Sequence, residues 1–225
     1  MTGRIFQKGA LKIFIFLIVL TLGGFLFYKQ TTMPKILENF ESHQWETAKE
    51  ETLIGVISDT HIPGRAKTLP KEIREIFKGV DLIIHSGDIE NLETLKELEK
   101  ITQVFAVEGN MDPKETKEKL PERISVKIFN FKIGIVHSLF PFWLGSHFNW
   151  LQEKVAKKLA QNQDFDILIF GHTHRPFLKE LNFEGKKVLL INPGSPTAPF
   201  FSQPSVAILK INPQNFEAKI IYLPR

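Results

Sequence analysis

The stretch "LIGVISDTH", residues 53–61, decides the fold of this chain, because an apolar run ends there in polar residues that can do chemistry. Its leucine, isoleucine and valine residues are typical of a buried β-strand at 53–58, and Asp59 and His61 follow directly. Runs of the same kind predict further strands at 81–86, 103–107, 132–137 and 166–170. Helical segments are expected near 70–77, 92–99 and 149–161. This alternation of strands and helices indicates an α/β layered core.

The last third of the chain has a different pattern. The segments "PFLKEL" and "KKVLLI", joined by the turn "NFEG", predict a β-hairpin, and further strands are expected near 205–210 and 218–222. Antiparallel strands at the end of an alternating pattern favour two sheets packed as a sandwich. We therefore predict an α/β fold, a two-sheet β-sandwich flanked by α-helices, in one domain spanning 52–225.

The first 30 residues form a separate object. An uncharged apolar run at 13–28 is preceded by basic residues and followed by Lys29, which is typical of a membrane anchor or a signal segment. Sixteen helical residues reach only about 24 Å across about 30 Å of hydrocarbon, so a cleaved signal peptide is the close alternative. Because no A-x-A site follows the run, an uncleaved transmembrane helix at 1–30 is favoured.

Two further expectations depend on that segment. The basic residues before the apolar run slightly outnumber those just after it. This asymmetry predicts a single-pass, membrane-anchored protein whose catalytic domain is extracytoplasmic. Residues 31–51 carry Pro34 and several charges, and are expected to form a linker with room for a short amphipathic helix.

The composition excludes several kinds of chemistry. The 225 residues contain no cysteine, so disulfides, thiolate nucleophiles and cysteine-ligated metal sites are ruled out. The 29 basic and 25 acidic residues are interspersed along the chain. Because no basic stripe is present in the sequence, we expect no specific nucleic-acid partner.

The residues able to bind metals or move protons follow the predicted strands, at the end where open α/β sheets place their ligands. They are Asp59, His61, His85, Asp88, Asn110, His137, His172 and His174. Singly, each has an ordinary explanation, such as a turn or a buried histidine, but their joint occurrence at five strand ends predicts one coordination site. Carboxylate, imidazole and amide ligands suit Mn, Fe, Zn, Co or Ni, and so many ligands suit two ions better than one.

These residues stand in motifs that resemble those of a known family. The motifs are "SDTH" (58–61), "HSGD" (85–88), "EGNMD" (108–112), "VHS" (136–138), "GHTH" (171–174) and "NPGS" (192–195). In this order they resemble the calcineurin-like metallophosphoesterases, and within them the small single-domain phosphodiesterases of the YfcE type. The resemblance implies the same two-sheet metallophosphoesterase fold.

The resemblance also implies a division of the ligands between two divalent metal ions. Asp59, His61 and His174 would bind one ion; Asn110, His137 and His172 would bind the other, and Asp88 would bridge them. His85 would lie outside this set and orient its neighbours. Manganese is the metal most expected, with nickel, iron, zinc, cobalt or magnesium as alternatives.

The activity implied is hydrolysis of a small phosphoester, most of all a phosphodiester, by a hydroxide held between the two ions. Asp88, His137 and Asn110 are the predicted catalytic residues. Arg65 and Arg175 are predicted to bind phosphate oxygens, with surface ion pairing as the alternative.

Two departures from the family pattern concern the substrate. Met111 stands where many relatives have a histidine that can act as general acid, which favours substrates with good leaving groups. Ser138 replaces a usual glycine. The aromatic segment at 140–150 is expected either to pack under a helix or to form a lip for a base or lipid chain. The alternative functions are a non-catalytic protein-interaction scaffold, as in the retromer subunit of this fold, a nuclease, or a membrane-proximal nucleotide or lipid pyrophosphate hydrolase.

Overall fold

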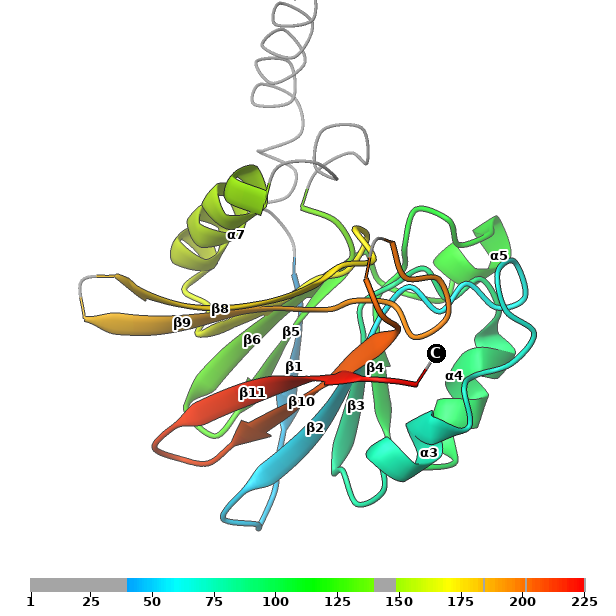
Figure 1. Cartoon of the computed structure of the whole chain (residues 1–225). Coiled ribbons are helices and arrows are strands. Elements are labelled where there is room, and N and C mark those ends of the chain that lie inside the picture. The colour runs from blue at the N-terminus through cyan, green and yellow to red at the C-terminus, as the bar shows by residue number, and fades with distance from the viewer. Residues whose placement is uncertain (1–39, 140–148, 184, 201, 225) are drawn as a thin grey trace, which may run out of the picture.

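Two β-sheets packed face to face form the centre of the computed structural model, which describes residues 40–139, 149–183, 185–200 and 202–224 (Figure 1). Within these residues, one sheet has six strands, in the order β1 (Glu41–Trp45), β5 (Arg123–Ile128), β6 (Phe131–Val136), β7 (Ile167–Ile169), β9 (Lys186–Pro193) and β8 (Pro176–Phe183). The other has five, in the order β11 (Phe216–Tyr222), β10 (Ser205–Ile211), β2 (Thr52–Ile57), β3 (Leu82–His85) and β4 (Val104–Ala106).

Strand direction brings the functional loops together. Strands β2, β3 and β4 run parallel, with Gly55 opposite Ile83 and Ile83 opposite Val104. In the other sheet β6, β7 and β9 are also parallel, with Ile133 opposite Ile167. Parallel strands end at the same edge of their sheet, so the loops that follow them are neighbours.

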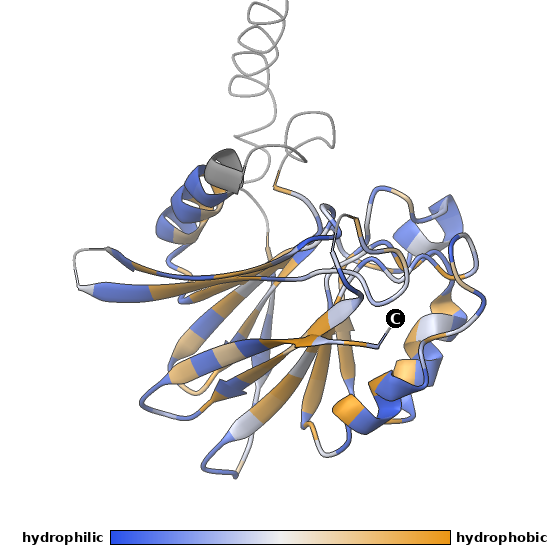
Figure 2. Cartoon of the chain, viewed as in Figure 1, coloured by the Kyte–Doolittle hydropathy of each residue, from blue (hydrophilic) through white to orange (hydrophobic). Residues whose placement is uncertain are grey.

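The main core lies between the two sheets. Because side chains alternate along a strand, every second residue faces the opposite sheet. Ile54 and Val56 of β2 and Ile133 and Ile135 of β6 are fully buried there. Figure 2 shows hydrophobic residues along the central strands, such as β2, β3 and β6, whereas much of the helices' surface is hydrophilic. Each such buried aliphatic side chain contributes about 1.5–3 kcal/mol relative to an exposed one.

Helices cover the outer faces of both sheets (Figure 1). Helix α3 (Glu72–Ile76) and helix α4 (Leu92–Glu99) pack on the five-stranded sheet, where Ile73 and Leu98 meet Ile83. Helix α7 (Asn149–Gln163) covers the six-stranded sheet, with Leu159 in the same buried cluster as Leu190. The short helix α5 (Lys114–Lys117) lies in the connection between β4 and β5. The predicted two-sheet sandwich flanked by helices is thus confirmed.

Residues 41–45 differ from the prediction of a linker with a short helix. They form β1, which pairs in parallel with β5 at the edge of the six-stranded sheet, with Glu41 opposite Ile124 and Trp45 opposite Ile128. The polar side chains of ESHQW suit a half-solvated edge strand, and Trp45 packs against the main core. Pairing with a distant strand, rather than local preference, determines this element.

The prediction of a transmembrane helix needs correction. It falls on residues 1–30, which lie outside the described residues. Across the four described ranges no helix is long and apolar enough to cross a membrane, and even α7 has only 15 residues with several charges among them. The described residues support the two-sheet sandwich flanked by helices. The transmembrane part of the predicted fold class and the membrane-anchored, extracytoplasmic localisation have no support there and are withdrawn.

Candidate metal centre

Loops from both sheets converge to form a cluster of carboxylates and imidazoles. Asp59 and His61 follow β2, Asp88 follows β3, and Asn110 follows β4, all in the five-stranded sheet. His137 follows β6, and His172 and His174 follow β7, in the six-stranded sheet. The site therefore lies at the shared edge of the two layers, where the strand-end pattern in the sequence predicts it.

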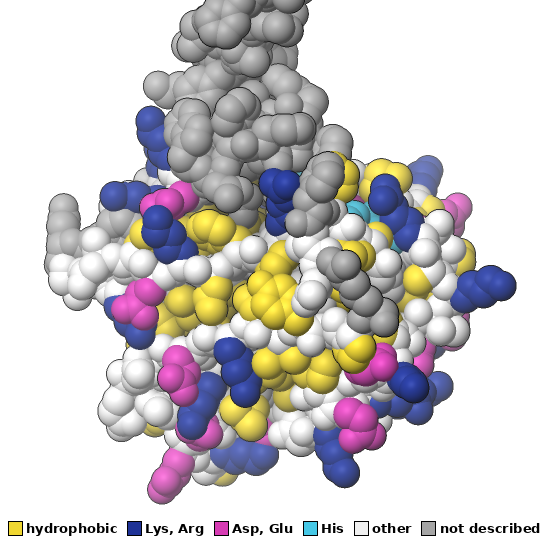
Figure 3. Space-filling model, viewed as in Figure 1, with side chains coloured by type: hydrophobic (Ala, Val, Ile, Leu, Met, Phe, Trp, Pro, Cys, Tyr) yellow, Lys and Arg dark blue, Asp and Glu magenta, His cyan; other side chains and the backbone are white. Residues whose placement is uncertain are grey.

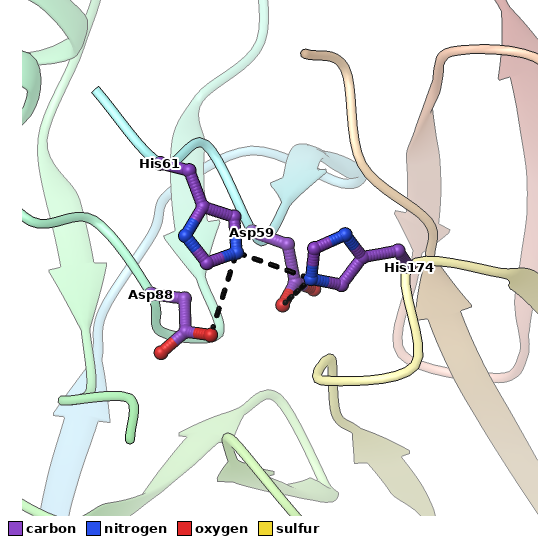
Figure 4. Close-up of side chains that lie close together, drawn as sticks. All are labelled: Asp59, His61, Asp88 and His174. Atoms are coloured by element: carbon purple, nitrogen blue, oxygen red, sulfur yellow. Dashed lines mark hydrogen bonds and ion pairs between the residues drawn. The ribbon is translucent and has the colours of Figure 1, made fainter. Parts of the chain in front are cut away.

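Four of these side chains form a first ligand cluster, in which Asp59, His61, Asp88 and His174 offer ligand atoms within 4.8 Å of one another. Figure 4 shows them pointing toward a common centre. The Nε2 atom of His61 lies 3.1 Å from Nε2 of His174 and 3.5 Å from Oδ2 of Asp88. The Nε2 atom of His174 is also 3.4 Å from Oδ1 of Asp59.

A second ligand cluster shares Asp88 with the first. It contains Asp88, His137 and His172, again with ligand atoms within 4.8 Å of one another. The Nε2 atom of His137 lies 3.3 Å from Oδ2 of Asp88 and 3.0 Å from Oδ1 of Asn110. All seven sequence-predicted ligands are thus brought together, and the same oxygen of Asp88 faces a histidine from each cluster.

The hydrogen bonds of three histidines determine which ring nitrogen carries the proton. The Nδ1 atoms of His61, His137 and His174 lie 2.8, 2.8 and 2.5 Å from Glu90 Oε1, Ser86 O and Ala198 O. Carboxylate and carbonyl oxygens only accept, so each Nδ1 carries the proton and, in the neutral ring, each Nε2 presents a lone pair.

In the first ligand cluster, the lone pairs on Nε2 of His61 and His174 face each other. His61 and His174 bring two Nε2 atoms within 3.1 Å, beside the carboxylates of Asp59 and Asp88. In the neutral rings neither nitrogen can donate to the other, so the arrangement is repulsive unless a cation lies among them. Divalent metal ions fit this donor set, since neutral imidazole and carboxylate oxygen are their usual ligands.

The electrostatic environment keeps most of the ligands in their metal-binding forms. Burial and, after it, the charge of nearby His137 lower the pKa of His172 to about 4, so the ring is neutral near pH 7. Burial also lowers the pKa of His174. For Asp88, burial alone would raise the pKa, but the hydrogen bond and charge of His137, the Met111 N–H and the charge of His61 together outweigh burial, and the pKa falls to about 2. Burial raises the pKa of Asp59 to about 6.

The His137 ring can bind a proton at the same nitrogen that a metal ion would need. Burial alone would lower its pKa, but the hydrogen bond and ion pair with Asp88 raise it to about 9. A proton on Nε2 would be donated to Asp88 Oδ2, which lies 3.3 Å away, whereas a metal ion would need this nitrogen unprotonated. The proton and the metal are therefore competitors for this nitrogen.

The backbone at these ligands is held in a conformation that non-glycine residues rarely adopt. Five of them have positive φ angles: Asp59 (53°), His61 (45°), Asp88 (55°), His172 (72°) and His174 (54°). Each costs on the order of 1 kcal/mol or more and persists only where its surroundings hold it. Among the described non-glycine residues, Glu90, Phe129 and Asp164 also have positive φ, and Glu90 contacts the ligand His61. Backbone strain is therefore concentrated at the candidate ligands, as is common at functional sites.

Two glycines let these loops approach one another. A Cβ atom at Gly109 would lie 2.1 Å from the backbone nitrogen of Asp88, and one at Gly171 would lie 1.9 Å from Oγ of Ser58. The glycine in "EGN" and the glycine in "GHTH" are therefore required by close packing against the first two ligand loops.

The "NPGS" segment, to which the sequence alone gives no role, ties the loops in place. Buried Asn192 donates from Nδ2 to Gly171 O at 2.8 Å and so fixes the start of the "GHTH" loop. The Ser195 hydroxyl donates to Asp59 O at 2.7 Å, and the Thr197 hydroxyl donates to Thr60 O at 2.6 Å. Asn192 belongs to β9 of the six-stranded sheet, and Ser195 and Thr197, just after this strand, hold a ligand loop of the five-stranded sheet.

Buried His85 lies beside the clusters, as the sequence suggests, rather than in them. Its Nδ1 accepts from the Gly87 backbone N–H at 3.2 Å, so its Nε2 carries the proton and donates to the Thr60 hydroxyl at 3.1 Å. Burial lowers its pKa to about 3, so the ring is neutral. His85 thus connects the loop after β3 to the loop after β2.

Glu90 is a positioning residue that sequence reasoning missed. Besides its bond to His61 Nδ1, it accepts from the Gly64 backbone N–H at 2.9 Å. A Glu90→Ala variant is expected to weaken metal affinity at the first cluster by about 10- to 100-fold, because His61 loses the partner that orients it. Calorimetric metal titration checks this, with Glu93→Ala, a carboxylate 70% exposed on α4, as the control. Unchanged affinity in Glu90→Ala would contradict the orienting role.

Asp112 is a second missed residue, and its role is structural. It is buried, and its carboxylate accepts backbone N–H groups of Ile89 at 2.7 Å, Glu90 at 2.6 Å and Gly109 at 2.7 Å. Replacement by alanine leaves these donors without their partner, so the free energy of unfolding should fall by about 3 kcal/mol. Urea denaturation checks this against exposed Glu115→Ala. Equal stability of the two variants would show that water replaces the carboxylate.

The remaining predicted residues lie around the clusters. Arg65 is exposed, and its backbone N–H donates to His61 O at 2.7 Å, while its charge contributes to lowering the pKa of His174. Arg175 is half-buried and donates from Nε to Phe200 O at 3.3 Å. Met111 is 54% exposed, and its backbone N–H donates to Asp88 Oδ1 at 2.7 Å. The aromatic segment at 140–150 lies outside the described residues except for its last two positions.

A two-sheet sandwich with carboxylates and histidines clustered at the shared strand ends defines the metallophosphoesterase class. The chain belongs to the calcineurin-like phosphoesterase superfamily, whose domain model matches residues 53–214. A probable metallophosphoesterase of Methanothermobacter thermautotrophicus is 39% identical over 169 residues, which are 75% of this chain and 91% of the relative. The resemblance seen in the motifs is thus confirmed.

Two further relatives extend the comparison. A phosphodiesterase of Methanocaldococcus jannaschii is 29% identical over 184 residues, covering 75% of this chain and 98% of the relative. Among solved structures, Vps29 from Entamoeba histolytica complexed with Zn²⁺ has a TM-score of 0.57 and 26% identity, and covers 76% of this chain and 99% of that one. The part of the chain that matches therefore covers nearly the full length of each of these relatives.

Proposed function

We propose that this protein is a metal-dependent phosphodiesterase that hydrolyses a small phosphoester at a site for two divalent ions. The observation that carries the proposal is the pair of ligand clusters that share Asp88. A carboxylate common to two clusters suits two ions held close together, the arrangement that favours in-line displacement at phosphorus. The M. jannaschii relative is itself named a phosphodiesterase, and Vps29 from E. histolytica has been solved with zinc.

The proposed ligands follow the two clusters. Asp59, His61 and His174 would hold one ion; Asn110, His137 and His172 would hold the other, and Asp88 would contact both. When bound, such ions lower the pKa of water and neutralise charge on phosphoryl oxygens. Manganese suits this nitrogen and oxygen ligand set, as do nickel, iron, zinc and cobalt.

The other residues of the site would bind the substrate. Arg65 and Arg175 lie next in sequence to the ligand loops and would contact phosphate oxygens through their guanidinium groups. Met111, half-exposed beside Asp88, has no proton to give a leaving group. We therefore expect the enzyme to prefer esters whose leaving alcohol or phenol is acidic.

The test is hydrolysis of bis(p-nitrophenyl) phosphate and p-nitrophenyl phosphate by the full chain, after chelation and again after addition of Mn²⁺, Ni²⁺, Zn²⁺ or Mg²⁺. We expect activity only with metal, and higher kcat/KM on the diester. Metal binding without turnover of either ester would contradict the proposal.

A second candidate function is a metal-binding scaffold of the same fold. The likeness to Vps29 favours it, because the full name of that protein, Vacuolar Protein Sorting 29, refers to sorting and not to an enzymatic activity. The same assay separates the two candidates, since a scaffold would bind metal ions at the clusters and turn over neither ester.

A further inference from the structure

A cavity of about 270 Å³ opens beside the second ligand cluster, with Asn110 and His137 in its wall. The other charged groups that line it are Glu108, Lys117, Glu122 and Arg123. Its volume lies just below the usual range for ligand pockets, which is about 300 to 1,000 Å³. A group attached to a phosphate at the clusters would therefore enter a compact, strongly polar space.

Local structure places these side chains around the cavity. Arg123 begins β5 and pairs with Val136 of β6, so it lies beside His137 across the hairpin. Lys117 ends α5 and donates from Nζ to the carbonyl of Asn110 at 3.1 Å. The backbone N–H of Glu108 donates to Pro121 O at 2.9 Å, which ties the loop after β4 to the start of β5.

The charges of the cavity are balanced. Two cations, Lys117 and Arg123, stand with two carboxylates, Glu108 and Glu122. The Arg123 side chain is only 15% exposed and donates from Nη2 to Glu122 Oε2 at 2.6 Å, whereas Glu122 is 69% exposed. An anionic ligand would be attracted by one pair and repelled by the other, so the cavity does not favour a second phosphate or a carboxylate.

A neutral group with several hydroxyls suits this balance better. Each hydroxyl can donate to a carboxylate and accept from an ammonium or guanidinium group, so both kinds of side chain gain a partner. We propose that the cavity is a subsite for one alcohol of a phosphodiester substrate and that it selects alcohols with additional hydroxyls, such as glycerol or a small sugar. The inference rests on the proposed function, because phosphorus at the clusters is what brings the alcohol to the cavity.

The test compares two diesters that release the same p-nitrophenolate, namely glyceryl p-nitrophenyl phosphate and propyl p-nitrophenyl phosphate, with the full chain loaded with Mn²⁺. They differ only in two hydroxyls, so kcat/KM should favour the glyceryl ester by about 10- to 100-fold. In Lys117→Met and Glu108→Gln this ratio should fall several-fold. Lys114→Met is the matched control, because Lys114 is also on α5 but its side chain is 85% exposed and does not line the cavity.

The outcomes separate the subsite from the proposed function. Hydrolysis of both esters with a ratio near one would overturn the subsite and leave the phosphodiesterase intact, as would an equal fall in Lys114→Met. If neither ester is hydrolysed, the proposed function fails and calorimetric binding decides the subsite. At least tenfold tighter binding of glycerol 1-phosphate than of propyl phosphate then supports it, and equal or undetectable binding overturns it.

Discussion

An Asp88→Asn variant is expected to lose about 10³-fold or more in metal-dependent hydrolysis of bis(p-nitrophenyl) phosphate, equivalent to about 4 kcal/mol of transition-state stabilisation. One oxygen of this carboxylate, Oδ2, faces His61 at 3.5 Å and His137 at 3.3 Å. Asparagine places an uncharged NH₂ group at the position of Oδ2, and this group cannot serve as an anionic ligand. The other oxygen, Oδ1, accepts the Met111 N–H at 2.7 Å, a bond that asparagine can keep.

The variant should therefore fold normally while both clusters lose their shared ligand. Metal content measured by mass spectrometry should fall together with kcat. Asp164→Asn is the matched control, since it makes the same change at a carboxylate that is 85% exposed. If Asp88→Asn retained both full metal content and turnover, the shared-ligand arrangement would be refuted.

Removal of the two histidines of "GHTH" should deplete different metal positions. His174 lies in the first ligand cluster and His172 in the second, although one residue separates them in the sequence. Each single alanine variant is expected to lose about one bound ion per chain and to reduce kcat/KM by about 100-fold or more.

Double variants decide whether this division is correct. A His172→Ala, His174→Ala protein should bind almost no metal, whereas His61→Ala, His174→Ala should still bind one ion, because both changes fall in the first cluster. His43→Ala, on β1, is the control histidine away from the clusters. Equal metal content in the two double variants would contradict the assignment.

Much of the site could be predicted from the sequence, because the ligands follow apolar runs and parallel strands end at a common edge. Helix α4 likewise lies at the predicted residues, since an apolar periodicity and the capping Asn91 mark it locally. Strand β5 was missed although "RISVKI" alternates as a strand should, and β1 could not be found locally, because only its distant partner makes it a strand.

The supporting residues could not be assigned, because their roles depend on loops that meet only in the folded chain. Glu90 and His61 are 29 residues apart, and Ser195 and Asp59 are 136 residues apart. Nothing in either segment indicates its partner.

The surface charges are distributed as the sequence suggests. On the face in Figure 3, basic and acidic side chains are interspersed, with hydrophobic side chains between them.

The segment after β9 hydrogen-bonds to the loop after β2, and the first cluster likewise draws its ligands from both sheets. An ion bound there would cross-link the two sheets. Sliding of one sheet over the other would then break coordinate bonds as well as side-chain contacts. Metal loading should consequently make the sandwich resist shear and unfold more cooperatively, and an assay of activity alone would never detect this effect.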